Sequence, residues 1–333
     1  MSSMKRNTPH LLKVIGLLAL ASLPLLNGRG DALTPDEQSA KVYGLTPEQL
    51  EHDKQEAKLN GLTLSDLEQG KLSGFTPKLI LLVRKLEPQL TNEYSLALKS
   101  PEGASQLQAT LRKALANIDA ASTPVTAKGN NLPASFIDLV FPKQEESSSD
   151  FAVRSAVIYS PGFMGLSSDN YVDQLTLEEW VWQLITNAPE ILMPVLQERA
   201  KVFPPTAADY ILCFSVEIGI DEANDYHLTG VGVPPSCSVG LLTMAQARNP
   251  IYRFIAVAEA EFVEPDMTKR LNFYSRYVNE TDPYILTLAI NGVAETKAPT
   301  AKNVLQSFLP AVQKTGDAKL ATRLQEQIQS LKL

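Results

Sequence analysis

The segment Tyr210–Ile220 reads YILCFSVEIGI, and it decides the predicted fold together with Ile251–Val263, which reads IYRFIAVAEAEFV. Both segments are rich in β-branched and aromatic residues, a composition typical of strands. In the second segment Arg253, Glu259 and Glu261 occupy odd-numbered positions and apolar residues stand between them. This alternation indicates a strand with one face in water. We therefore predict a strand in each segment.

Four further segments also have the character of strands: Ser135–Phe141, Phe151–Tyr159, His227–Val233 and Pro283–Asn291. One helical insertion is predicted from Thr176 to about Val202, because Thr176 and Glu179 have the spacing of a capping box. Pro189 and Pro194 are expected to kink this helix or split it. Strands that follow one another with a single helical insertion favour an antiparallel or mixed sheet. The sequence thus predicts an α+β domain over residues 134–296.

Residues 33–122 are predicted to form a helical N-terminal region of short helices. The pattern Leu-Thr-Pro occurs at 33–35 and 45–47, with looser copies at 62–66 and 75–78. Each Thr can cap a helix, and Pro is well suited to the first helical position that follows. A glycine precedes three of these starts and suits the left-handed end of the previous helix: Gly44, Gly61 and Gly74.

The two ends of the predicted α+β domain are also marked in the sequence. Residues 123–133 are rich in turn-forming residues and predict a linker. After residue 296, Thr300–Lys314 and Asp317–Leu331 have apolar residues at helical spacing. We expect residues 297–333 to form a C-terminal helical hairpin that turns at Gly316.

The first 32 residues have the order of a secretory signal peptide. Three basic residues precede the apolar run Val14–Leu26, and small residues follow it. The run is shorter than the roughly 20 residues that span a bilayer. We predict cleavage after Gly30 or Ala32 and export to the periplasm or the exterior, with no integral membrane segment left. An uncleaved anchor is the alternative.

The charge of the chain excludes some partners. The whole chain of 333 residues has a formal net charge of −7. Residues 1–32 carry four basic side chains and one acidic one, so the chain without them has −10. Nucleic-acid binding requires clustered Lys and Arg, so we predict no nucleic-acid partner. A hydrophobic content of 44% is ordinary for a globular protein.

The chain has two cysteines, Cys213 and Cys237. In an oxidising compartment an even pair predicts one disulfide. It would close a loop of about 25 residues and stabilise the fold by roughly 3 kcal/mol. The alternative is two free thiols, because Cys213 lies in an apolar run where a small buried thiol packs well.

The densest polar cluster follows the first quoted segment and suggests a metal site. Carboxylate oxygens with one imidazole suit calcium, manganese or zinc. The cluster consists of Glu217, Asp221, Glu222, Asp225 and His227. The alternative is a solvated acidic loop between two strands, since the spacing matches neither an EF-hand nor a zinc signature. A divalent cation is the only cofactor that the sequence leaves open.

A hydrolytic site is the other chemical hypothesis. Glu217 could pair with Glu259 or Glu261, because glycoside hydrolysis needs two carboxylates across a cleft. A Ser-His-Asp arrangement would have to use His227, since His52 lies in a charged helix and is expected at the surface. No G-x-S-x-G motif occurs. The candidate catalytic residues are thus Glu217, His227 and Glu259.

No motif in the sequence identifies a family or a reaction. The composition favours an exported, non-enzymatic component of an envelope or secreted assembly, with other envelope or secreted proteins as its partners. Its binding surfaces would be the short helices of the N-terminal region and the C-terminal hairpin. The alternatives are an exported hydrolase and a small-ligand-binding protein with its pocket between the sheet and the helix at 176–202.

Overall fold

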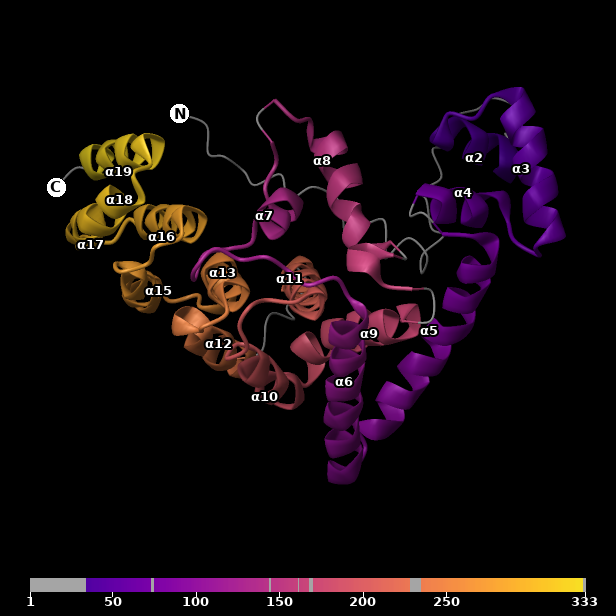
Figure 1. Cartoon of the computed structure of the whole chain (residues 1–333), viewed down its shortest axis with the longest axis horizontal. Coiled ribbons are helices and arrows are strands. Elements are labelled where there is room, and N and C mark those ends of the chain that lie inside the picture. The colour runs from indigo at the N-terminus through magenta and orange to yellow at the C-terminus, as the bar shows by residue number, and fades with distance from the viewer. Residues whose placement is uncertain are drawn as a thin grey trace. The chain divides into compact units, whose positions relative to one another are not determined.

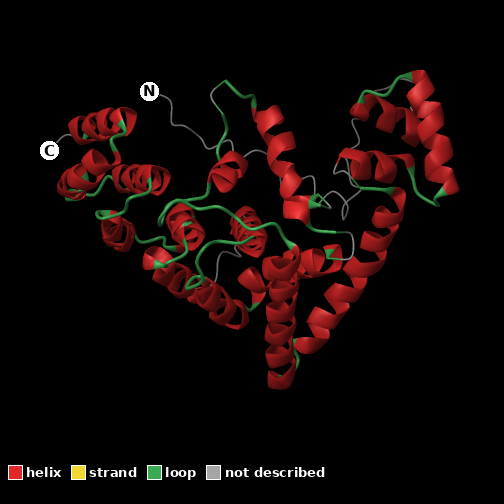
Figure 2. Cartoon of the chain, in the orientation of Figure 1, coloured by secondary structure: helices red, strands yellow, loops and turns green. Residues whose placement is uncertain are grey.

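The computed structural model describes residues 34–72, 75–143, 145–160, 162–167, 170–227 and 235–331. In these ranges every regular element is a helix, and Figure 2 contains no strand. The predicted α+β fold with a central sheet is therefore wrong, and the described chain is all-helical. The predicted signal peptide lies outside the described residues, as does nearly all of the strand predicted at His227–Val233.

The chain divides into two compact units. The first contains the residues up to Leu90 together with Asp138–Val172, and the second contains Thr91–Ile137 and the residues from Asp173 onward. Three helices have residues in both: α5 (Pro77–Ala97), α7 (Ala134–Val140) and α9 (Tyr171–Asn187). The boundaries predicted for the N-terminal region, the linker and the C-terminal hairpin stay predictions.

The first unit begins with three short helices, drawn in indigo in Figure 1. The helix α4 packs against both α2 and α3. The elements of this unit, besides its share of the three helices above, are α2 (Pro35–Tyr43), α3 (Pro47–Leu59), α4 (Leu64–Leu72), α8 (Ser148–Ser155) and the 3-10 turns η1 (Ala156–Tyr159) and η2 (Phe163–Gly165).

The predicted threonine caps of this unit are confirmed. The Thr34 hydroxyl accepts from the Glu37 amide at 3.3 Å, and the Glu37 carboxylate accepts from the Thr34 amide at 2.7 Å. Thr46 and Gln49 form the same reciprocal pair at the start of α3. Gly44 ends α2 with φ of 66°. Local cap chemistry therefore fixes where these helices begin. Thr63 forms the same reciprocal pair with Asp66 before α4, and the Thr76 hydroxyl accepts from the Leu79 amide at the start of α5.

The second unit contains a longer series of helices that pack on one another. The helix α10 packs against α6 and α12, α11 against α6 and α13, and α16 against α13 and α15. The bounds are α6 (Pro101–Ala121), α10 (Pro189–Arg199), α11 (Ala207–His227), α12 (Pro235–Leu242), η3 (Thr243–Gln246), α13 (Pro250–Ala258), α14 (Ala260–Val263), α15 (Met267–Tyr274), η4 (Ser275–Tyr277), α16 (Pro283–Glu295), α17 (Ala301–Ser307), α18 (Leu309–Thr315) and α19 (Ala318–Ser330).

Two of the segments that were predicted to be strands are helices buried on all sides. In α11 every residue from Tyr210 to Val216 is buried, and every residue of α13 is buried. A helix without a solvent face shows no 3.6-residue polar period, so an apolar run alone cannot separate it from a buried strand. The other predicted strands are also helices, namely α7, α8 with η1, and α16, although each of these has exposed residues.

The capping box predicted at Thr176 is also wrong. Helix α9 begins at Tyr171, so Thr176 lies inside it and its side chain is buried. The helical insertion is split at Pro189, one of the two outcomes expected there, because α9 ends at Asn187 and Pro189 occupies the first turn of α10. This agrees with the preference of proline for a helix start, whereas Pro194 lies inside α10 without ending it.

A buried ion pair joins helices of the second unit. The Arg199 guanidinium, at the end of α10, donates to Asp209 of α11 at 3.0 Å and to Asp119 of α6 at 2.6 Å. Asp209 is completely buried, and the Arg199 side chain is largely so. Removing a charge from water is costly unless it is paired and hydrogen-bonded. Arg199 therefore fixes α6, α10 and α11 to one another.

The Asp209 carboxylate accepts further hydrogen bonds that extend this network. Its oxygens accept from the Thr206 amide at 2.8 Å, the Asn249 amide group at 3.0 Å and the Tyr252 hydroxyl at 3.0 Å. Asn249 in turn caps α13, which contains Tyr252. Burial raises the pKa of Asp209, while Arg199 and the surrounding donors oppose that rise. The network thus joins a fourth helix to the other three.

A second buried ion pair holds the segment predicted as a linker. Arg253 donates to Glu280 at 2.8 Å and to the backbone carbonyl of Asn130 at 2.6 Å. The amide of Leu132 donates to the buried carboxylate of Asp282 at 2.8 Å. Residues 123–133 contain no helix. These contacts nevertheless attach them to α13 and to the start of α16.

We expect Arg199→Met to lower the free energy of unfolding by about 3–5 kcal/mol, because it leaves the buried Asp209 carboxylate without its cationic partner. The matched control is Arg112→Met. Arg112 also pairs across α6 and α10, with Glu198, but both of these side chains are exposed, so the loss should stay below about 1 kcal/mol. Urea unfolding of both variants measures the difference. Equal losses would contradict the assigned role of the Arg199 network.

Candidate functional site

The predicted metal-binding residues lie on a helix and not on a loop between strands. Glu217 and Asp221 are half-buried residues of α11. They are four residues apart, so they share one face of that helix. Asp225 and His227 belong to the same helix, but their side chains, like that of Glu222, lie outside what the structure describes. The metal site on α11 stays a prediction, and the loop on which it was placed is corrected to a helix.

The predicted carboxylate pair lies near the two cysteines. Burial raises the pKa of the Cys213 thiol, and the charges of Glu217 and Glu259 raise it further. Burial also raises the pKa of Cys237 to about 12, with Glu259 contributing. Residues predicted for the metal site, for the hydrolytic carboxylate pair and for the disulfide therefore lie near one another in the second unit.

This neighbourhood is enclosed. Only 5% of Glu259 is exposed, at the junction of α13 and α14, and Glu217 is half-buried. A carboxylate that acts on a saccharide has to touch it, so the burial of Glu259 argues against that role. Glu261 is a half-buried residue of α14 whose carbonyl accepts from Arg270 at 3.3 Å.

The predicted disulfide is wrong. Cys213 and Cys237 are both free and completely buried. Cys213 lies on α11, which packs against α6, α13 and α14, and Cys237 lies on α12, which packs against α10, η3, α13 and α14. Each thiol is thus enclosed by the packing of its own helix. The alternative interpretation, in which the small thiols act as buried packing residues, fits this arrangement.

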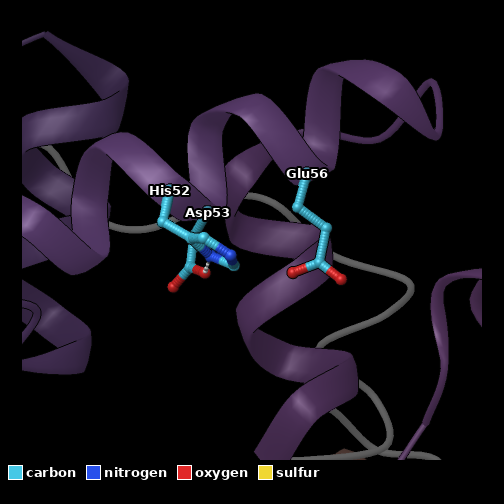
Figure 3. A group of neighbouring side chains, drawn as sticks. All are labelled: His52, Asp53 and Glu56. Carbon is cyan, nitrogen blue, oxygen red and sulfur yellow. Dashed lines mark hydrogen bonds and ion pairs between the residues drawn. The ribbon is translucent and has the colours of Figure 1, made fainter.

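A different cluster, in the first unit, was not singled out from the sequence. His52, Asp53 and Glu56 lie on α3, and each offers a donor atom within 4.8 Å of the donor atoms of the other two. Figure 3 shows the three side chains extending from α3. The His52 ring nitrogen Nδ1 and Asp53 Oδ1 are 2.9 Å apart. The predicted surface position of His52 is confirmed, since 76% of its side chain is exposed.

A lysine from α4 lies against this cluster. The ammonium nitrogen of Lys71 is 2.5 Å from Asp53, 3.1 Å from Glu56 and 3.3 Å from Glu68. Burial lowers the pKa of Lys71, but the three carboxylates outweigh this effect and raise it. Burial raises the pKa of Glu68, and contact with Asp53 raises it further. The cluster therefore joins α3 to α4 and contains more acidic than basic groups.

The only sequence signal for this cluster is the spacing of His52 and Glu56. Residues four apart lie on the same face of a helix. Glu68 and Lys71 are on the next helix, so the sequence could not show that they converge with His52 and Glu56.

No family model, curated protein or solved structure matches this chain. Any inference about function therefore depends on the residues themselves. Within the described ranges, none of the helices is both long enough and apolar enough to cross a membrane.

We expect both cysteines of the native protein to resist a thiol reagent at about pH 8, because burial keeps them protonated and out of reach. In denaturant two thiols per chain should react. Thiol titration with and without denaturant, on protein never exposed to a reductant, measures this. A chain with no reactive thiol in denaturant, and an intact mass lower by two hydrogens, would show that the disulfide forms.

Proposed function

We propose that this protein is a non-enzymatic binding component that holds another protein within an envelope or secreted assembly. We further propose that it binds through α2 and α3, which we call the N-terminal helix pair. Export by the predicted signal peptide would bring it to the periplasm or the exterior. There its partners would be other envelope or secreted proteins.

The observation that supports this proposal is how little of the N-terminal helix pair is buried. Among the described side chains none in α2 is buried, and α3 buries only Asp53 and Ala57. Most helices in proteins owe their stability to an apolar face packed on a core. These two depend on caps, on an ion pair between Asp36 and Lys54 at 3.5 Å, and on the Lys71 cluster. Most of their surface is therefore available to a partner.

The exposed side chains of α3 fit a reversible interface. They are mostly polar or charged, and Leu59 at the end of the helix is 86% exposed. Reversible protein interfaces are about as apolar as the rest of a protein surface. Polar helices with a large exposed leucine therefore suit a partner that binds and leaves.

The C-terminal hairpin is a weaker candidate for the binding surface. Of its predicted apolar residues, Leu309 and Leu331 are half-buried and the others are buried, namely Leu305, Val312, Leu320, Leu324 and Ile328. They lie where α17 and α18 pack against α19, and α16 packs against all three helices. Because this apolar face serves the fold of the second unit, it is not available to another chain.

The alternatives have less support. The hydrolase would use Glu217 with Glu259 or Glu261, in the enclosed neighbourhood described above. The small-ligand-binding protein was to have its pocket between a sheet and the helix at 176–202, and the described chain has no such sheet. Neither alternative gains a specific observation in its favour.

Site-specific photocrosslinking in cells that naturally make the chain tests the proposal. We expect a photoreactive residue at Gln55 or Leu59 to give one discrete adduct with the same partner. The control positions are Gln325 and Glu326, which are exposed on α19 and should give none. Adducts of equal yield from both helices, or none from α3, would contradict the proposal.

A substitution makes the test quantitative. We expect Leu59→Asp to lower the yield of the Gln55 adduct about fivefold or more, which corresponds to roughly 1 kcal/mol lost at one contact. Leu96→Asp is the matched control, because Leu96 is also exposed but belongs to the second unit. An equal effect of the two substitutions would place the interface elsewhere.

A further inference from the structure

We infer that the cluster on α3 and α4 is a binding site for a divalent cation of the zinc or manganese class. His52, Asp53 and Glu56 of α3 would be ligands, and Glu68 of α4 is the fourth candidate. In the cation-free chain the ammonium of Lys71 takes the place of the metal. The site is independent of the proposed binding function.

The spacing of the donor atoms supports this assignment. Ligands of one zinc ion lie about 2.0–2.2 Å from it, so their donor atoms are at most about 4.4 Å apart. The donors of His52, Asp53 and Glu56 already lie within 4.8 Å of one another. The side chains of His52 and Glu56 are partly in water, with 76% and 32% exposed. Small rotations of these two side chains would bring the donors to bonding distance.

The charge of the cluster supports it independently. Three carboxylates face one ammonium, so the acidic groups outnumber the basic group of Lys71. The side chains of Asp53 and Glu68 are about nine-tenths buried, with 10% and 9% exposed. A buried charge that lacks compensation is costly. One divalent cation together with Lys71 would balance the three carboxylates.

Glu68 provides the third observation. Its side chain is about nine-tenths buried, and its Oε1 oxygen forms an ion pair with the Lys71 ammonium, 3.3 Å away. Because that ammonium can move, this oxygen is available to a cation that enters the cluster.

The set of donors selects the metal. Calcium and magnesium prefer oxygen ligands, whereas an imidazole with carboxylates suits zinc or manganese. The cation also has to displace the ammonium from Asp53 and Glu56. Lys71 can move, because its side chain is 36% exposed and ends a flexible stem.

Calorimetric titration of the EDTA-treated full-length protein with zinc chloride, and separately with manganese chloride, tests the site. We expect one cation per chain. His52→Ala and Glu68→Gln should each weaken binding by about tenfold or more. Glu51→Gln, an exposed residue of the same helix that is not on the face shared by His52 and Glu56, should leave binding unchanged. No binding of either metal, or binding that neither His52→Ala nor Glu68→Gln weakens, would overturn the inference.

Two further variants exclude the main alternatives. Lys71→Met should bind zinc several-fold more tightly, and zinc should restore the melting temperature that this variant loses. A variant that loses stability and is not rescued by zinc would show that Lys71 only joins the two helices, and would overturn the inference. His227→Ala should not affect binding. If His227→Ala abolished zinc binding and His52→Ala did not, the ion would belong to α11.

Discussion

The buried carboxylate of Asp209 sets the constraint on which the second unit depends. A charge in that position is tolerated only if a cation and several donors surround it. Arg199, Thr206, Asn249 and Tyr252 meet that need, and they come from three successive parts of the chain. Because Arg199 also holds Asp119, one polar centre fixes how four helices meet. The apolar side chains pack between helices whose positions this polar centre constrains.

In the first unit, too, a basic side chain pairs with buried carboxylates, but there the carboxylates outnumber it. Lys71 is one cation among three carboxylates, at a site that water partly reaches. The helices α2 and α3 bury little apolar surface, so polar contacts carry a larger part of their stability. An acidic excess next to exposed helices is poorly explained by folding alone. It is consistent with a surface that binds a cation and a partner protein.

The sequence predicted the local features well and the buried ones badly. The Thr-Pro starts of the first unit were predictable because a cap is made by neighbouring residues. Asn249-Pro250 and Asp282-Pro283 carry the same signal and do start α13 and α16, yet the β-branched residues after them favoured strands. In α13, burial on all sides had removed the polar face that distinguishes a helix. The alternating charges were misleading for the same reason, since Arg253 and Glu259 are buried and do not face water. The α3–α4 cluster requires Lys71 and Glu68 from a second helix, so no local pattern reveals it.

Native-state hydrogen exchange tests the central claim most directly. That claim is a second unit fixed by a buried polar centre and an N-terminal helix pair held mainly by caps and ion pairs. It predicts that the amides of α10, α11 and α13 exchange slowest, together and at the rate of global unfolding. The amides of α2 and α3 should exchange much faster, through local opening. Equal protection of α2 and α3 and of the helices around Asp209 would contradict the account.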